Sequence, residues 1–492
     1  MPQLTALDAQ FLHFESPTTA AHVAGVAILE GGAVTVDSLA ALLTERLHLS
    51  PALSQRLTGL PYGLDRPHWA PDPDFDLSHH LAEHTLPAPG DELRLAELLA
   101  RLHERHLDRD RPLWEMHLVK GLSGGRVALY TKVHHAAIDG VSGAETLAAL
   151  LDLGPEPRTV DRPAPGRRAE GPHPVELITA ALTGALAQPA NTARSLAVAA
   201  SELDAIPLLS ALPGAARLAG AARRLLGDDR PRPELPPLAA PRTPFNGPIT
   251  AGRRLAFGSI PLKEVKQVAK GFGVTVNDVV MAVCAGALRS WLEEREALPE
   301  QPLVAAVPVA CRTAGGLDRA GNQLAMLAVP LATDVAEPRE RLAAVREATG
   351  TAKRRLAMAQ GNWLAELCGL LPTALGRVAT APLSRLAASA CPPINILISN
   401  VPGPQFPLYL CGARVLSYFP ISVLTDLGGG VNITCFSYDG MLDFGLVSCP
   451  TRVPEPEGLL GHLHSAMKEL VTLEEAAGDE FRHRVEVDGV PG

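Results

Sequence analysis

The sequence predicts an α/β protein with two sheet-containing units joined by a helical connection. Three observations lead to this class. Short runs rich in β-branched and aromatic residues alternate with longer helical runs in both the first and the last parts of the chain. The stretch between them is rich in Pro and Ala and reads as helices broken by prolines. Hydrophobic residues make up 47% of the 492 residues, which is enough apolar material for more than one core.

The first unit is predicted to cover residues 1–154. It contains a strand over 23–30 and a helix over 36–47 that Thr35 or Asp37 could cap. A second helix is expected over 91–106 because leucines recur along one face. Further elements are two strands, over 116–121 and 126–133, that form a hairpin, and a short helix over 144–153.

The second unit is predicted to cover residues 249–475, followed by a polar tail over 476–492 that is expected to fray. Its expected helices cover 261–271, 276–294, 338–359, 363–390 and 455–473. Its expected strands cover 254–260, 303–309, 324–331, 394–399, 413–417, 430–438 and 442–449. The last two strands are joined at Asp439-Gly440, which is a typical hairpin turn.

The connection over residues 155–248 contains Ala- and Leu-rich helical stretches over 175–226. Prolines at positions 189, 207 and 213 divide these stretches. We expect the helices to pack on the outside of the two units, and contact with lipid is the alternative. Packing on protein is favoured, because a helix that seeks a lipid surface usually carries bulkier apolar residues and more Lys or Arg.

Charge and cysteine usage restrict the function. The net charge of −9 and the pI near 6.0 disfavour nucleic acid as a partner. Neither a signal peptide nor an apolar run of roughly 20 residues is visible, so a cytoplasmic protein is expected, with contact to membranes or lipid droplets left open. The 7 cysteines form no CxxC pair, and no His cluster has common metal spacing, so no metal site is predicted.

The most informative stretch is His134-His135-Ala136-Ala137-Ile138-Asp139-Gly140, between the strand over 126–133 and the helix after it. Neighbouring side chains on a strand point to opposite faces, so the two histidines are not expected to enter one cleft together. A single imidazole at a strand end suits a general base, because its pKa lies near neutrality. A histidine pair satisfied within a loop is the alternative for such a dipeptide.

This stretch resembles the active-site motif HHxxxDG of CoA-dependent acyltransferases. Four other motifs are similar to those of the bacterial bifunctional wax ester synthase/diacylglycerol acyltransferase family. They are LDAQFL at residues 7–12, PLW at 112–114, ND at 277–278 and SNVPGP at 399–404, in the order found in that family. Cys449-Pro450 departs from the more polar pair of the family. The resemblance implies two chloramphenicol-acetyltransferase-like domains, each a mixed sheet with flanking helices.

The resemblance also implies roles for individual residues. His135 would take the proton of a hydroxyl acceptor, while His134 would buttress the site. Asp139 would hold the turn around Gly140 and could pair with Arg312. Asn277 has two interpretations, capping of the helix over 276–294 or binding of the thioester carbonyl or the acceptor, and Asp278 shares its motif. A backbone N–H near Gly140 is the other candidate donor to the oxyanion. Trp114 is better explained as a core residue than as a substrate contact. Asn400 would support a rigid turn.

Three functions remain open. The first is transfer of a fatty acyl group from acyl-CoA to diacylglycerol or a long-chain alcohol, as the resemblance implies. The second is a same-fold acyltransferase acting on a polyketide or glycolipid hydroxyl, and the third is a non-catalytic lipid-binding protein. Direct transfer without a covalent acyl-enzyme is predicted, because no GxSxG elbow is present. Acyl-CoA is the co-substrate and no cofactor is expected. The sequence leaves the oligomeric state, the acyl chain length and the CoA-binding residues open.

Overall fold

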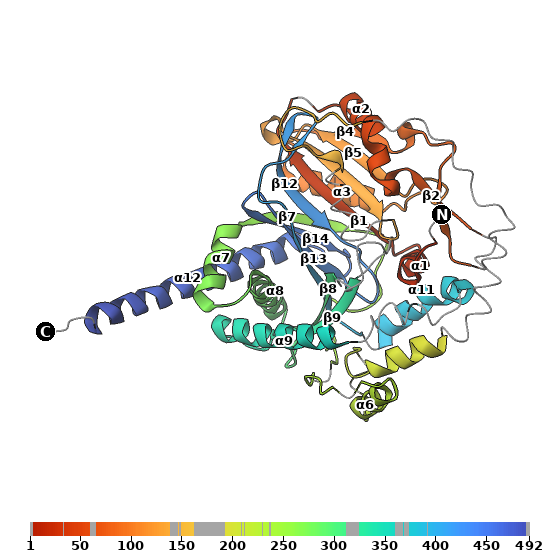
Figure 1. Cartoon of the computed structure of the whole chain (residues 1–492). Helices are drawn as coiled ribbons and strands as arrows, with labels where there is room; N and C mark the ends of the chain where they lie inside the picture. The colour runs from red at the N-terminus through yellow and green to blue at the C-terminus, as the bar shows by residue number, and fades with distance from the viewer. Residues whose placement is uncertain are drawn as a thin grey trace.

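The computed structural model describes the chain except for a set of short segments and one longer one. The segments that lie outside the description are residues 1–2, 33, 60–64, 138–145, 147–148, 162–191, 208, 211, 229, 236–237, 311–323, 360–367, 369–372, 391 and 489–492. The described residues form a mixed α/β protein with two six-stranded sheets, in agreement with the predicted class (Figure 1).

The first sheet has the strand order β11-β12-β1-β6-β5-β4. Its strands are β1 (His22–Leu29), β4 (Leu81–Thr85), β5 (Trp114–Lys120), β6 (Val127–His134), β11 (Tyr409–Leu410) and β12 (Ala413–Ile421). The predicted hairpin is present, because β5 and β6 pair antiparallel. Leucines of α2 (Val36–Arg46) pack in the core on one face, and those of α3 (Glu92–His103) pack on the other. Thr35 is the residue that caps α2, and Asp91 caps α3.

The second sheet has the strand order β7-β14-β13-β10-β8-β9. Its strands are β7 (Arg254–Pro261), β8 (Val304–Ala310), β9 (Leu324–Pro330), β10 (Ile396–Pro402), β13 (Val431–Tyr438) and β14 (Met441–Ser448). Helices cover one side of it (Figure 1): α7 (Leu262–Phe272), α8 (Val276–Glu293), α9 (Pro338–Met358) and α12 (Pro456–Asp488). The core is centred on α8, which is buried from Asp278 to Leu288 and again at Trp291 and Leu292.

The two sheets are joined by a strand exchange that the linear order of elements did not predict. β11 and β12 come from the last part of the chain, yet β12 pairs antiparallel with β1 of the first sheet. β12 also crosses β14 so closely that a Cβ on Gly445 would lie 1.8 Å from the Pro420 carbonyl oxygen. Because β12 completes one sheet while packing on the other, the two units share a common core.

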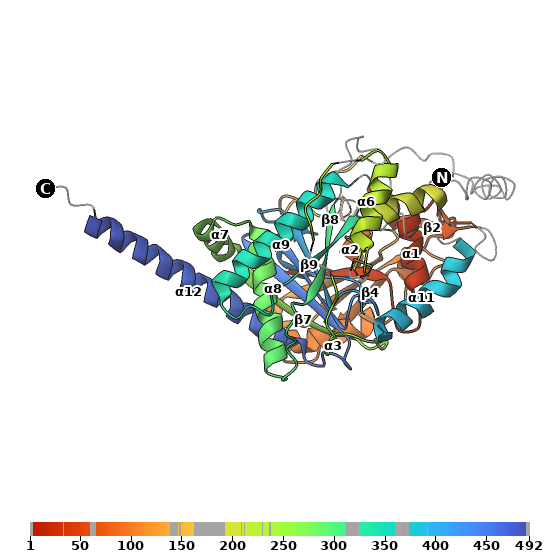
Figure 2. The ribbon, with the colours of Figure 1, turned by 90° about the horizontal axis from the view of Figure 1, so that it is seen from below.

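Three predicted elements end later in the structure than the sequence predicted. The strand predicted to end at residue 399 continues to Pro402 as β10, so Asn400 lies within a strand and not in a turn. The strand predicted over 413–417 extends to Ile421, because it finds β1 as a partner. The closing helix does not end at residue 473: α12 continues to Asp488 and projects from the body in both views (Figures 1 and 2).

The connection is described in part. A helix over residues 192–201 and α6 (Ala215–Leu225) lie side by side on the outside of the molecule (Figure 2). Arg355 of α9 anchors this region to the second unit, because its guanidinium contacts the Asp204 carboxylate and donates to the Pro233 carbonyl at 3.1 Å. Within the described segments, no single helix is long and apolar enough to cross a bilayer. One bent pair, α7 with α8, meets that test only jointly.

Candidate active site

The histidine pair lies at the end of the central strand β6, at one edge of the first sheet where the strands end. β6 lies between β1 and β5, and its last residue, His134, pairs with His22 of β1. His135 begins a turn over residues 135–137, where the strand geometry ends. Hydrogen bonds on both sides therefore hold the strand up to the histidine pair.

His134 is buried, with a hydrogen bond at Nδ1, while its Nε2 faces the Glu15 carboxylate at a geometry that forms no hydrogen bond. Its side chain is 1% exposed, and its Nδ1 accepts a hydrogen bond from the Ala136 N–H at 3.0 Å. Its Nε2 lies 3.3 Å from Oε1 of Glu15. Because Nδ1 is the acceptor, the proton of the neutral ring belongs on Nε2, where the carboxylate faces it.

His135 is the first residue of the turn that follows β6. Its backbone N–H donates to the Ala21 carbonyl at 2.9 Å. Its half-buried ring stacks on Phe11 of α1 (Ala6–Phe14), with ring centroids 3.8 Å apart and planes 12° apart. The ring orientation is therefore set by a flat aromatic contact from one side.

Glu15 is the principal site residue that sequence reasoning missed. Its carboxylate is 7% exposed and receives the Arg109 guanidinium through Nε at 2.9 Å and Nη2 at 2.5 Å. Burial disfavours ionisation of Glu15, but its interactions with His134 and Arg109 outweigh burial and lower its pKa to about 2. Glu15 is therefore a buried anion directly behind His134.

The same carboxylate also reaches the backbone on which His135 rests. Oε1 of Glu15 accepts from the Ala21 N–H at 3.3 Å, and the Ala21 carbonyl accepts from His135. Arg109 additionally donates to the Leu12 carbonyl at 2.7 Å, near the end of α1. Glu15 and Arg109 thus connect three parts of the site: α1 with Phe11, the Ala21 backbone and the His134 ring. No local signal in the sequence predicts this connection, because the partners lie far apart in the chain.

A row of buried polar groups lies on the face of the first sheet that α3 covers. Lys132 is 0% exposed, and its Nζ donates to the Leu102 and Arg105 carbonyls and lies 3.0 Å from Oε2 of Glu115. Burial lowers the pKa of Lys132, although Glu115 opposes that shift. Burial likewise lowers the pKa of His22 and of His103 well below the ordinary value, so both rings are neutral at pH 7. This row packs the sheet against α3 behind His134.

Asn277 and Asp278 have different roles in the structure. The cap of α8 is Thr275, whose Oγ1 accepts from the Asp278 N–H at 3.2 Å, and the Asp278 carboxylate accepts from the Thr275 N–H at 3.0 Å. The predicted capping role of Asn277 is therefore wrong, since the capping box begins two residues earlier. Asp278 is its reciprocal member.

Asn277 instead lies against β10 of the second sheet. Its Oδ1 accepts a hydrogen bond from Nδ2 of Asn400 at 3.4 Å, and Oδ1 of Asn400 accepts one from the Cys435 thiol at 3.4 Å. Among the described residues, the buried Nδ2 of Asn277 has no hydrogen-bond partner. A buried amide donor without an acceptor is costly, which indicates a position where an acceptor is expected.

Trp114 is a core residue. It is 1% exposed, its Nε1 donates to the Leu53 carbonyl at 2.9 Å, and its ring stacks on His80 at 4.4 Å. Each part of this side chain is therefore used in packing. Asp139, Gly140 and Arg312 lie outside the described residues, so the predicted roles of these three residues remain predictions.

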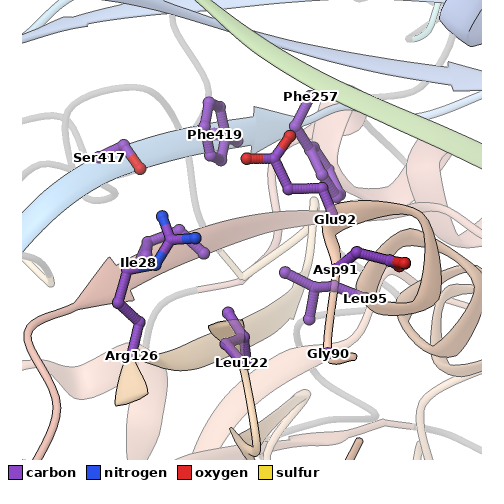
Figure 3. A pocket seen from close by; sticks show the side chains of 10 residues that line it. All are labelled: Ile28, Gly90, Asp91, Glu92, Leu95, Leu122, Arg126, Phe257, Ser417 and Phe419. Atoms are coloured by element: carbon purple, nitrogen blue, oxygen red, sulfur yellow. The ribbon is translucent and has the colours of Figure 1, made fainter. Parts of the chain in front are cut away.

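Two hollows in the described part of the protein lie away from the histidine pair. The first holds about 40 Å³ between α3 and both sheets, and Figure 3 shows Asp91, Arg126 and Phe257 among the residues around it. The second holds about 390 Å³ and is lined by Leu47, His48 and Phe75 among others. His134 and His135 line neither hollow, so neither is the predicted substrate passage.

Comparisons with known proteins agree with the motif order. The family model for the wax ester synthase/diacylglycerol acyltransferase catalytic domain matches residues 4–280, and the model for the C-terminal domain of the same family matches residues 320–471. A probable diacylglycerol O-acyltransferase of Mycobacterium tuberculosis is 37% identical over 96% of this chain and 98% of its own length. A putative diacylglycerol O-acyltransferase of the same organism is 38% identical over 95% of this chain and 99% of its own length.

Solved structures show the same relationship. The wax ester synthase/diacylglycerol acyltransferase from Marinobacter aquaeolei has a TM-score of 0.65 and 30% identity, covering 97% of this chain and 100% of that chain. The first condensation domain of the calcium-dependent antibiotic synthetase has a TM-score of 0.55 at 17% identity, with 96% of each chain covered. At that identity the second likeness concerns the fold alone.

Proposed function

Because the chain belongs to the wax ester synthase/diacylglycerol acyltransferase family and is an O-acyltransferase, we propose that it transfers a fatty acyl group from acyl-CoA to a lipid hydroxyl. The acceptor is diacylglycerol, giving triacylglycerol, or a long-chain alcohol, giving a wax ester. The observation that carries this proposal is the difference in burial between the two imidazoles. His134 is buried and held, while His135 emerges half-buried at the end of β6.

In the proposed reaction His135 is the general base. It takes the hydroxyl proton of the acceptor while the acceptor oxygen bonds to the thioester carbonyl carbon. The carbon–sulfur bond then breaks, and the same imidazole returns the proton to the CoA sulfur. The atoms balance without a further reactant, so acyl-CoA serves as the co-substrate and no cofactor is needed.

A direct transfer is favoured over a covalent acyl-cysteine. Burial raises the pKa of the thiols of Cys284 and Cys368 to about 12 and raises that of Cys435 well above its ordinary value. Thiols of this kind are poor nucleophiles near pH 7, because the thiolate is the reactive form. At Cys449 burial is outweighed by hydrogen bonds with Thr250 and Thr451, which lower its pKa, so the poor reactivity holds for the other three thiols only. The Nδ2 of Asn277 is our candidate donor to the oxyanion that develops on the thioester carbonyl.

Glu15 and Arg109 act as positioning residues in this scheme. The Glu15 carboxylate faces the His134 ring and accepts a hydrogen bond from the Ala21 N–H, and the Ala21 carbonyl accepts one from the His135 N–H. Arg109 neutralises the buried carboxylate and ties it to the end of α1. Preorganisation of this kind is what allows a base to remain aligned through the reaction.

Release of CoA thiol from palmitoyl-CoA tests the proposal, measured separately with hexadecanol and with diacylglycerol. We expect His135→Ala to lose about 10²–10⁴-fold in acyl transfer, the usual contribution of a general base, while CoA binding is retained. Equal turnover by this variant would rule His135 out as the base. Turnover only with another alcohol, such as a glycolipid hydroxyl, would favour the same-fold alternative.

We further propose that the enzyme works at a lipid surface. Both acceptors are long-chain lipids that partition into membranes or lipid droplets, so the protein must reach them there.

A further inference from the structure

The helix α6 presents its apolar residues in an inverted arrangement. Its inward face consists of small residues, with Ala215 5% exposed and Ala219 0% exposed. Its bulky residues face outward, with Leu218 62% exposed and Leu225 89% exposed. A helix on the surface of a globular protein usually buries its large apolar side chains and exposes its polar ones. This helix packs on the protein through its alanines. Two leucines, two helical turns apart, remain exposed on its outer side.

The outward leucines are accompanied by arginines at the same spacing. Arg217 and Arg224 directly precede Leu218 and Leu225, and both guanidinium-bearing side chains are exposed. No ion pair joins either arginine to a carboxylate in the described part of the chain. The nearby acids are already neutralised: Glu202 by Arg232, Asp204 by Arg223 and Arg355, and Asp228 by Arg230 and Arg232. This surface is therefore locally basic on a chain whose net charge is −9.

The neighbouring helix over residues 192–201 continues the surface. Leu196 is 53% exposed, and Arg194 on the same helix is exposed as well. Arg223 of α6 donates to the Ser201 carbonyl at 2.8 Å, which fixes the two helices together. Figure 2 shows them side by side on the side of the molecule that faces the viewer.

We propose that α6 and this neighbour dock the protein on an anionic lipid surface. The docking surface comprises Leu196, Leu218 and Leu225 with Arg194, Arg217 and Arg224. The leucines would enter the boundary between headgroups and acyl chains, and the arginines would bind lipid phosphates from the same side. The proposal rests on the proposed function only in that such a surface holds the acyl acceptor.

Vesicle sedimentation of the full chain tests the proposal. The vesicles are phosphatidylcholine alone, or equal parts of phosphatidylcholine and phosphatidylglycerol. We expect binding to the mixed vesicles that Leu218→Ser/Leu225→Ser weakens about tenfold or more, because two buried leucine side chains are lost. Arg217→Gln/Arg224→Gln should weaken binding to the mixed vesicles and reduce its salt dependence. Leu93→Ser on α3 is the matched control, since Leu93 is a helical leucine that is 56% exposed elsewhere.

Two further measurements make the outcome decisive. Transfer from a short-chain acyl-CoA to a short alcohol, both dissolved in water, should be unchanged in the leucine variant. Loss of that activity in all variants would count against the proposed reaction and would not test the docking surface. Two results would overturn the proposal: equal binding of the wild type to both kinds of vesicle, or binding of the leucine variant to mixed vesicles as strong as that of the wild type. So would a concentration-dependent dimer that the leucine variant abolishes, because the occupant would then be a second copy of the chain.

Discussion

At the scale of single residues, the site depends on a buried anion next to a buried imidazole. Glu15 is ionised throughout the neutral range because its pKa is lowered to about 2, and it contacts both His134 and the Ala21 backbone. A buried carboxylate is tolerated only when donors surround it, and here Arg109 and the Ala21 N–H do so.

We predict that Glu15→Gln lowers kcat by about 10- to 100-fold with a smaller change in KM for acyl-CoA, since it perturbs alignment and not substrate contact. The pH–rate profile should also change, because the charge beside His134 is lost while Gln can still accept from the Ala21 N–H. Glu15→Asp should restore part of kcat.

Glu115→Gln is the control for this prediction. Glu115 is also a partly buried carboxylate of the first sheet, with its pKa lowered to about 2: burial opposes that shift, while His117 and Lys132 outweigh it. Its loss should reduce stability without a comparable loss of kcat, because it contacts neither histidine of the pair. An equal loss of kcat in both variants would show that Glu15 acts only through general stability.

At the scale of elements, different residues at the start of α8 serve as the helix cap and as the proposed oxyanion donor. Thr275 and Asp278 form the capping box, while the side chain of Asn277 faces Asn400 of β10. We predict that Thr275→Ala costs about 1 kcal/mol in the free energy of unfolding, as loss of a helix cap usually does. Chemical denaturation measures this change.

Asn277→Ala should instead lower kcat and leave the free energy of unfolding nearly unchanged. We expect a loss of about 10²-fold or more in kcat, as for removal of an oxyanion donor, with little change in stability. If Asn277→Ala destabilised the protein as much as Thr275→Ala and retained its turnover, the assignment of Asn277 as the oxyanion donor would be wrong.

At the scale of the whole molecule, one buried carboxylate links the two sheets. Asp443 of β14 is 0% exposed, accepts from Ser259 Oγ of β7 at 2.6 Å and accepts from the Tyr418 N–H of β12 at 2.8 Å. Burial raises its pKa to about 6, although both hydrogen bonds oppose the shift. The folded protein therefore binds a proton at Asp443 that the unfolded chain releases at lower pH.

The sign of the pH dependence follows from that difference. Because the folded state binds more protons than the unfolded state between about pH 4 and pH 6, Asp443 makes the protein less stable as pH rises through this range. Asp443→Asn removes the ionisation, so its stability relative to wild type should increase from pH 4 to pH 7. Thermal unfolding at both pH values measures the change. A difference that is the same at both values would show that Asp443 does not titrate in this range.

The sequence by itself determined most of the local structure and the family. Hydrophobic periodicity and turn residues predicted most strands of the two large sheets and the helices of the second unit, because those signals are local: Thr35 before α2 and Asp439-Gly440 between β13 and β14. They missed α1, β4 and β11, and also the small strand pair β2 (Gln55–Thr58) and β3 (His68–Pro71). The tertiary structure alone decided the contacts between distant segments. These are the pairing of β12 with β1, Glu15 behind His134, and Asn277 against Asn400, together with the outward leucines of α6. The physical reason is that burial and pairing depend on what the rest of the chain places beside a residue, which periodicity along one segment does not encode.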